Sequence, residues 1–236
     1  MFSPNEAKRY AKQTILDEVG LIGQVKLKNS RVVVIGAGGL GCPIIQYLSA
    51  CGVGMIGIVD FDVIEHSNLH RQVLYTPQDI GKKKAEVAKE RVLAQNPDTV
   101  IEIFDCALND DNADFILSQF DLVIDGCDNF LTRYIVNDTC VELGKSLVYG
   151  SILGFQGQLA VFNHNGSKNL RDLFPEPPNA EDVPNCSDNG VLGVVPGIIG
   201  TLMANEALKC ILELEINLNT FHIFDLLSLE MTKLRF

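Results

Sequence analysis

Short runs of consecutive apolar residues alternate with amphipathic segments through roughly the first 150 residues of the chain. The clearest run is RVVVI at 31–35, which is typical of a strand covered on both faces of a sheet. Further strands are expected at 55–60, 99–105, 120–126, 146–151 and 157–162. Helical patterns separate them at about 40–50, 82–95, 112–119 and 130–143. The alternation predicts a parallel sheet with right-handed crossover helices.

The two ends of the chain depart from this alternation. Residues 5–28 predict two short, polar helices separated near Gly20, and a polar segment with four prolines covers 163–190. A strongly apolar helix and two strands are expected after it, at about 197–213, 221–226 and 229–236. We therefore predict one α/β domain spanning 1–236, with a Rossmann-like, doubly wound, mostly parallel sheet that continues into antiparallel strands and an N-terminal helical segment over 1–30.

Composition narrows the class of protein. The net charge is −11 and no basic face stands out, so we expect no nucleic-acid partner. The seven cysteines form no C-x-x-C pair and their number is odd, which indicates a reducing compartment and a cytoplasmic protein. The start of the chain lacks the apolar core of a secretory signal. Two long uncharged stretches, 32–59 and 189–205, contain glycine and proline that we expect to break a membrane span, so no membrane partner is predicted.

A glycine motif suggests a nucleotide site. Gly36-x-Gly38-x-x-Gly41 follows the first predicted strand and opens a helix, where glycines allow backbone N–H groups to approach phosphates. Asp60 ends the next strand, where a carboxylate can accept hydrogen bonds from ribose hydroxyls. These residues alone fit a redox dinucleotide as well as ATP.

Three further features favour ATP. Asn68 and Arg71 lie in an irregular segment after the second strand, and three lysines, 82–84, are placed in the first turn of the next predicted helix. Cations there oppose the helix dipole unless an anion binds between them, although a solvated lysine cluster would explain them too. Asp128 follows another strand, where it can hold Mg²⁺ or, like Asn129, cap the following helix. Extra cations and a carboxylate at one sheet edge suit a triphosphate.

These motifs carry a family resemblance. The chain resembles the ThiF/MoeB/HesA adenylyltransferases, bacterial relatives of the ubiquitin-activating enzymes, from about Arg9 to its end. The stretches that carry it are RVVVIGAGGLGCPIIQYLSACGVGMIGIVDFDVIEHSNLHRQ, IGKKKAEVAKERVLAQNP, DLVIDGCDNFLTRYIVN, GFQGQLAVF and GVVPGIIGTLMANEALK. The resemblance implies ATP-dependent adenylation of the C-terminal Gly-Gly carboxylate of a small ubiquitin-like sulfur-carrier protein. It also implies a nucleotide-binding half, 31–150, and a carrier-binding half, 151–236, with 163–190 as a crossover loop.

The resemblance assigns roles to particular residues. Arg71, Lys84 and Asp128 match the catalytic positions, and Asp128 would hold the Mg²⁺ ion. The implied nucleotide-binding residues are Gly36, Gly38, Gly39, Gly41, Asp60, Asp62, Asn68, Arg71, Lys84 and Asp128. The family is generally homodimeric, and an arginine from the partner subunit approaches the ATP. Lys12 stands at that position here, with Arg9 one turn earlier, so either could serve.

Two other positions distinguish the chain from relatives. Where many members have the first C-x-x-C pair of a zinc site, this sequence has Asn169 and Asp172, and we expect no zinc. Cys186, in the polar stretch VPNCSDNG, matches a cysteine that links covalently to the activated carrier in ThiF-like members, and it weakly favours the thiamine branch over the molybdopterin branch. A neutral loop cysteine is the alternative.

Two other functions stay open from the sequence. One is an NAD(P)-dependent oxidoreductase, which the glycine motif and Asp60 would support without the added cations. The other is a relative that binds nucleotide or carrier without completing the reaction. A within-family variant would activate another acceptor, such as a peptide C-terminus.

Overall fold

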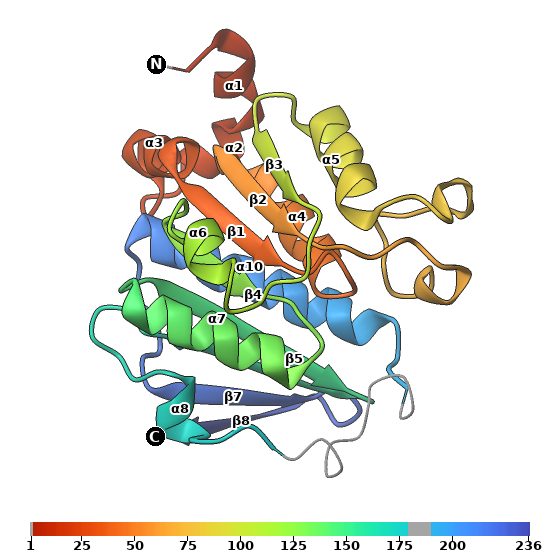
Figure 1. The fold of residues 1–236 in the computed structure, drawn as a ribbon. Coiled ribbons are helices and arrows are strands. Elements are labelled where there is room, and N and C mark those ends of the chain that lie inside the picture. Colours follow the sequence, from red (N-terminus) through yellow and green to blue (C-terminus); the bar gives the residue numbers. More distant parts are fainter. Residues whose placement is uncertain (1, 179–189) are drawn as a thin grey trace.

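One eight-stranded sheet organises the chain (Figure 1), which a computed structural model describes over residues 2–178 and 190–236. The strands are β1 (Arg31–Ile35), β2 (Met55–Val59), β3 (Val100–Phe104), β4 (Leu122–Asp125), β5 (Ser146–Leu153), β6 (Gln156–Phe162), β7 (Thr220–Asp225) and β8 (Glu230–Arg235). Their order in the sheet is β3-β2-β1-β4-β5-β6-β7-β8. The first five are parallel and the last three antiparallel. The predicted fold class, a parallel sheet continuing into antiparallel strands, is confirmed.

Helices cover both faces of this sheet (Figure 1). One apolar core joins the sheet to α4 (Gly41–Cys51), α5 (Lys84–Gln95) and α10 (Val194–Leu212). A second core, on the opposite face, contains α6 (Ala113–Leu117), α7 (Phe130–Glu142) and α8 (Leu170–Leu173). Alternate strand residues explain the division, because Val32 and Val34 belong to the first core whereas Val33 and Ile35 belong to the second. The continuous apolar run 31–35 is therefore a doubly covered strand.

The N-terminal segment contains three helices rather than the two we predicted. They are α1 (Pro4–Arg9), α2 (Ala11–Thr14) and α3 (Gly20–Asn29). The additional break lies at Tyr10, whose backbone leaves the helical region and whose ring is buried. The Asn96 side chain donates to the Tyr10 hydroxyl at 3.0 Å, so a long-range contact ends α1 where local periodicity continues.

The apolar helix α10 begins at Val194, three residues before its predicted start, so Pro196, which we expected to break this stretch, lies inside the helix. Pro196 lies in the first turn, where no backbone donor is required. A Cβ atom at Gly200 would lie 2.5 Å from the Leu40 carbonyl oxygen, so this glycine lets α10 approach α4 closely. Within the described residues, α10 is the one helix long and apolar enough to cross a membrane. Core helices pass the same test, and α10 packs against α4, β5 and β6.

Candidate functional site

The glycine loop lies where the winding of the sheet changes direction. β1 neighbours β2 on one side and β4 on the other, so the segments after β1 and β4 meet at one edge. Gly36 has a φ of +93°, and a Cβ atom there would lie 2.9 Å from the Gly126 carbonyl oxygen. A Cβ at Gly41 would collide with the Gly36 carbonyl. The glycines are required for this packing, and they bring the loop beside the segment that carries Asp128.

Asp128 and Asn129 have different roles. The Asn129 side chain accepts a hydrogen bond from the Thr132 backbone N–H at 2.9 Å and caps α7. Asp128 is exposed and makes no hydrogen bond or ion pair with the described part of the chain. The sequence left helix capping open for both residues, and the structure shows that Asn129 is the cap. The Asp128 carboxylate is available for a cation.

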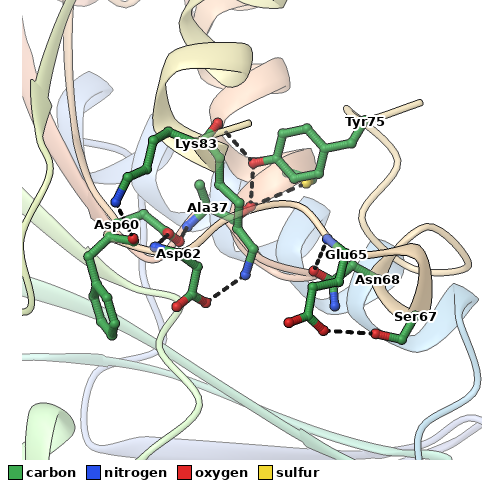
Figure 2. Close-up of polar contacts among 11 residues, drawn as sticks. Ala37, Asp60, Asp62, Glu65, Ser67, Asn68, Tyr75 and Lys83 are labelled. Atoms are coloured by element: carbon green, nitrogen blue, oxygen red, sulfur yellow. Dashed lines mark hydrogen bonds and ion pairs between the residues drawn. The ribbon is translucent and has the colours of Figure 1, made fainter. Parts of the chain in front are cut away.

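Asp60 supports the glycine loop itself (Figure 2). Its Oδ2 accepts from the Ala37 backbone N–H at 2.7 Å, and its Oδ1 accepts from the Asp62 backbone N–H at 2.9 Å. Burial raises the pKa of the Asp60 carboxyl, although these hydrogen bonds and Lys84 oppose the shift. The remaining lone pairs can still accept from a ribose.

Lys84 is the buried lysine of the run 82–84. Its Nζ lies 2.7 Å from the Asp62 Oδ2, so Asp62 is the ion-pair partner of Lys84 rather than a free ligand. Our placement of all three lysines in the first helical turn is wrong, because α5 starts at Lys84. Lys82 pairs with Asp79, and Lys83 pairs with Asp105. Carboxylates of the chain therefore satisfy Lys82 and Lys83, and neither requires an anion.

Arg71 approaches the loop from the segment after β2. Its Cγ would lie 3.7 Å from a Cβ at Gly39, and its Nη1 donates to the Ser67 carbonyl at 3.0 Å. Asn68 is buried, and its Oδ1 accepts from the Glu65 backbone N–H at 3.2 Å, which shapes the turn shown in Figure 2. The structure thus places Arg71 beside the glycine loop, and Asn68 in the turn that carries Arg71, whose backbone N–H donates to the Asn68 carbonyl at 3.0 Å.

Sequence reasoning missed three residues of this site. Gln72 is buried, its Nε2 would lie 3.6 Å from a Cβ at Gly38, and its Oε1 has no partner in the described structure. Tyr75 donates from its hydroxyl to the Ala37 carbonyl at 2.7 Å (Figure 2). Arg133 donates to the Cys127 carbonyl at 2.6 Å. Glutamine and tyrosine carry no motif signal here, and an arginine within a helix is ordinarily read as exposed.

The two candidates for a cation supplied to a partner subunit lie differently. Arg9 donates to the Gln95 carbonyl at 3.0 Å, so its own chain holds it at the end of α5. Lys12 is exposed and has no hydrogen bond or ion pair with the described residues. This arrangement favours Lys12 over Arg9 as the cation supplied to a partner subunit.

The zinc and cysteine predictions fall in the crossover segment. Asn169 and Asp172 form a capping box at the start of α8, a short helix inside the segment that we expected to be a crossover loop. No cluster of three or more metal-ligating side chains occurs within 2–178 and 190–236. Cys186 lies outside the described residues, so its role stays a prediction.

Comparison with known proteins identifies the family. The sequence profile described as "ThiF family" matches residues 10–236. The chain belongs to the ThiF family. A relative from Thermus thermophilus, named sulfur carrier protein adenylyltransferase, is 51% identical over 216 residues, which cover 89% of this chain and 80% of the relative.

Other ThiF-family relatives are longer. A probable molybdopterin-synthase adenylyltransferase from Porphyra purpurea is 49% identical, and a probable adenylyltransferase/sulfurtransferase, MoeZ, from Mycobacterium tuberculosis is 46% identical. Each match covers 89% of this chain but 56% and 54% of the relative, so the chain spans about half of their length. The E. coli MccB structure with MccA-N7isoASN shares the fold, with a TM-score of 0.85, 22% identity and coverage of 96% of this chain and 72% of MccB.

Proposed function

We propose that this ThiF-family chain adenylates the C-terminal Gly-Gly carboxylate of a small ubiquitin-like sulfur-carrier protein, using ATP and releasing pyrophosphate. One observation carries the proposal: the glycine loop, Arg71, Lys84 and the unpaired carboxylate of Asp128 converge on a single sheet edge. The curated relatives are named adenylyltransferases, which favours this reaction over an oxidoreductase. We assign ATP binding to 31–150 and carrier binding to 151–236.

The chemistry requires the control of negative charge. A carboxylate oxygen of the carrier forms a bond to the α-phosphorus, the bond to the β-phosphate oxygen breaks, and pyrophosphate leaves with that electron pair. Both reactants are anions, so the protein contributes mainly alignment and charge neutralisation. Backbone N–H groups of the glycine loop would hold phosphates at the start of α4, where no described side chain caps the helix. Arg71 and Lys84 would stabilise charge that develops on the phosphate oxygens.

Asp128 fits a magnesium ion. Its carboxylate is exposed beside the glycine loop and unpaired in the described structure, and hard oxygen ligands are the type that Mg²⁺ prefers. The ion, when bound, would neutralise phosphate charge. No zinc is part of the proposal.

The carrier would dock beside the nucleotide edge. Exposed apolar side chains gather at the β5–β6 and β7–β8 turns. These turns are adjacent, since the Leu226 backbone N–H of the second donates to the Phe155 carbonyl of the first at 2.9 Å. The exposed members are Leu153, Phe155, Leu227 and Leu229. A cluster of this kind is suited to a partner protein. We further propose a cytoplasmic homodimer in which Lys12 of each chain reaches the nucleotide site of the other.

ATP–pyrophosphate exchange with a panel of purified Gly-Gly-tailed carriers tests the proposal. We expect radiolabel from pyrophosphate to enter ATP only when an intact carrier is present, and a carrier without its last glycine is the matched control. The thermal shift caused by ATP with Mg²⁺, compared with the shift caused by NADH, distinguishes the proposed adenylyltransferase from an oxidoreductase. Stabilisation by NADH, or ATP binding without exchange for every carrier, would overturn the proposed reaction.

A further inference from the structure

The peptide unit of Ala37, in the middle of the glycine loop, is held from both sides. Its N–H donates to the Asp60 carboxylate at 2.7 Å, and its carbonyl accepts from the Tyr75 hydroxyl at 2.7 Å. Figure 2 shows the Tyr75 ring directed at this carbonyl from the side opposite Asp60. The Cys42 thiol makes a longer contact with the same carbonyl, at 3.5 Å. The two shorter contacts set the orientation of a peptide whose neighbours, Gly36 and Gly38, have no side chains to restrain them.

Further hydrogen bonds connect both Asp60 and Tyr75 to Lys84. Asp60 accepts from the Asp62 backbone N–H at 2.9 Å, and the Asp62 Oδ2 pairs with the Lys84 Nζ at 2.7 Å. The Lys84 backbone N–H also donates to the Asp62 carbonyl at 3.0 Å. On the other side, the Tyr75 hydroxyl lies 3.3 Å from the Lys84 carbonyl. The five residues therefore form a closed ring of hydrogen bonds between the loop and the first residue of α5.

Tyr75 is the neutral member of this ring whose polar contact can be deleted alone. Its side chain is buried, and burial raises the pKa of its hydroxyl, which keeps the proton that it donates. A hydroxyl has one proton, so the shorter contact to Ala37 is the principal hydrogen bond and the Lys84 carbonyl shares it. Phenylalanine at this position would keep the packing of the aromatic side chain and remove only the hydrogen bond to the Ala37 carbonyl, which the Lys84 carbonyl shares.

We propose that the Tyr75 hydroxyl is a positioning group that fixes Lys84 relative to the glycine loop, so that both act on the same polyphosphate. The inference rests on the proposed ATP site. Lys84 is long and flexible on its own, and a cation stabilises phosphate charge only when its location is restrained. The ring supplies this restraint through Asp62 at the side chain and through Tyr75 at the backbone.

The first test compares Tyr75→Phe with Tyr134→Phe. Tyr134 is a residue buried to the same extent, and its hydroxyl donates to the Glu176 carbonyl at 2.8 Å, a contact that involves no member of the hydrogen-bond ring. Each variant loses one hydroxyl that donates to a backbone carbonyl, so the two should have similar melting temperatures. By isothermal titration with ATP and Mg²⁺, we expect about fivefold weaker binding for Tyr75→Phe and less than about twofold change for Tyr134→Phe. A merely structural tyrosine would change both variants alike.

A double-mutant cycle with Lys84→Ala tests the route of the effect. If Tyr75 acts through Lys84, adding Tyr75→Phe to Lys84→Ala should weaken ATP binding by less than about twofold further. Wild-type affinity in Tyr75→Phe, or the same fivefold loss with and without Lys84, would overturn the inference while ATP binding by the wild type stands. Failure of the wild type to bind ATP would instead overturn the proposed function, and this inference with it.

Discussion

Arg133 and Asp125 form an ion pair inside the protein, with 3.2 Å between the Arg133 Nη1 and the Asp125 Oδ2. Arg133 is 4% exposed and Asp125 is 0% exposed, so neither charge is stabilised by solvent. Arg133 also donates to the Gly150 and Cys127 carbonyls, and Asp125 accepts from the Cys127 backbone N–H. The pair thus joins β4, β5 and the segment that carries Asp128.

Removing one partner of this pair should be costly. Arg133→Met leaves the Asp125 carboxylate buried without its cation, and we expect a loss of about 3 to 5 kcal/mol in the free energy of unfolding. Arg171→Met is the matched control, because its pair with Asp138 is partly solvated and should contribute about 1 kcal/mol or less. Urea denaturation measures both. Equal losses would show that the buried pair has no special structural role.

Arg71 should be essential for the chemical step. Its side chain lies beside Gly39, and one preorganised donor at a developing negative charge is typically worth about 10²- to 10³-fold in rate. We expect Arg71→Ala to reduce pyrophosphate exchange by about this factor and Arg71→Lys to retain an intermediate rate, because lysine keeps the charge without the planar fork. Most of the activity surviving in Arg71→Ala would remove this residue from the site.

Asp128 and the adjacent Asn129 should be separable. Asp128→Asn should shift the Mg²⁺ dependence of exchange to higher concentration, since the neutral amide is a weaker ligand. Asn129→Ala deletes the cap of α7 and should lower stability by about 1 kcal/mol without moving the Mg²⁺ midpoint. Magnesium titration and thermal unfolding of both variants give the comparison. A shifted midpoint in Asn129→Ala alone would reverse the assignment.

Asp79 should make folding stability dependent on acid pH. Burial acts to raise its pKa, but hydrogen bonds from Thr76, Lys82 and Arg91 outweigh it and hold the pKa far below the ordinary value. Because the folded pKa is depressed, the contribution is complete at pH values well above the unfolded pKa near 4 and is lost progressively as the pH falls through that value toward the lower folded pKa. In Asp79→Asn the free energy of unfolding should therefore decline less than in the wild type between roughly pH 6 and pH 3. Chemical denaturation at a series of pH values measures this decline. Parallel curves would contradict this account.

Cys186 should matter after adenylation rather than during it. Its predicted role is a covalent link to the activated carrier, so Cys186→Ser is expected to keep normal pyrophosphate exchange and lose sulfur transfer to the carrier. Mass spectrometry of the carrier C-terminus detects the thiocarboxylate. Full sulfur transfer by the serine variant would show that Cys186 has no part in the reaction.

Local patterns were sufficient for a large part of the fold and for selecting residues that the structure gathers at one sheet edge. A continuous apolar run predicted the doubly covered strand β1, because a strand buried on both faces has apolar residues on both of them. Helix boundaries were less accurate. α1 ends early because Asn96 binds Tyr10, which is a contact between distant segments. α10 begins three residues early because Pro196 lies in its first turn, where no backbone donor is required.

The sequence by itself determined the chemical types: a glycine turn after a buried strand, an acidic residue at the next strand end, and basic residues downstream. These follow from backbone sterics and from the periodicity of burial, which act over a few residues. Only the tertiary structure decided that Lys84 faces Asp62 while Lys82 and Lys83 bind other carboxylates. It likewise brought Tyr75 to Ala37 and Arg133 to Asp125. Those pairings depend on how whole elements pack, and residue type alone does not encode them.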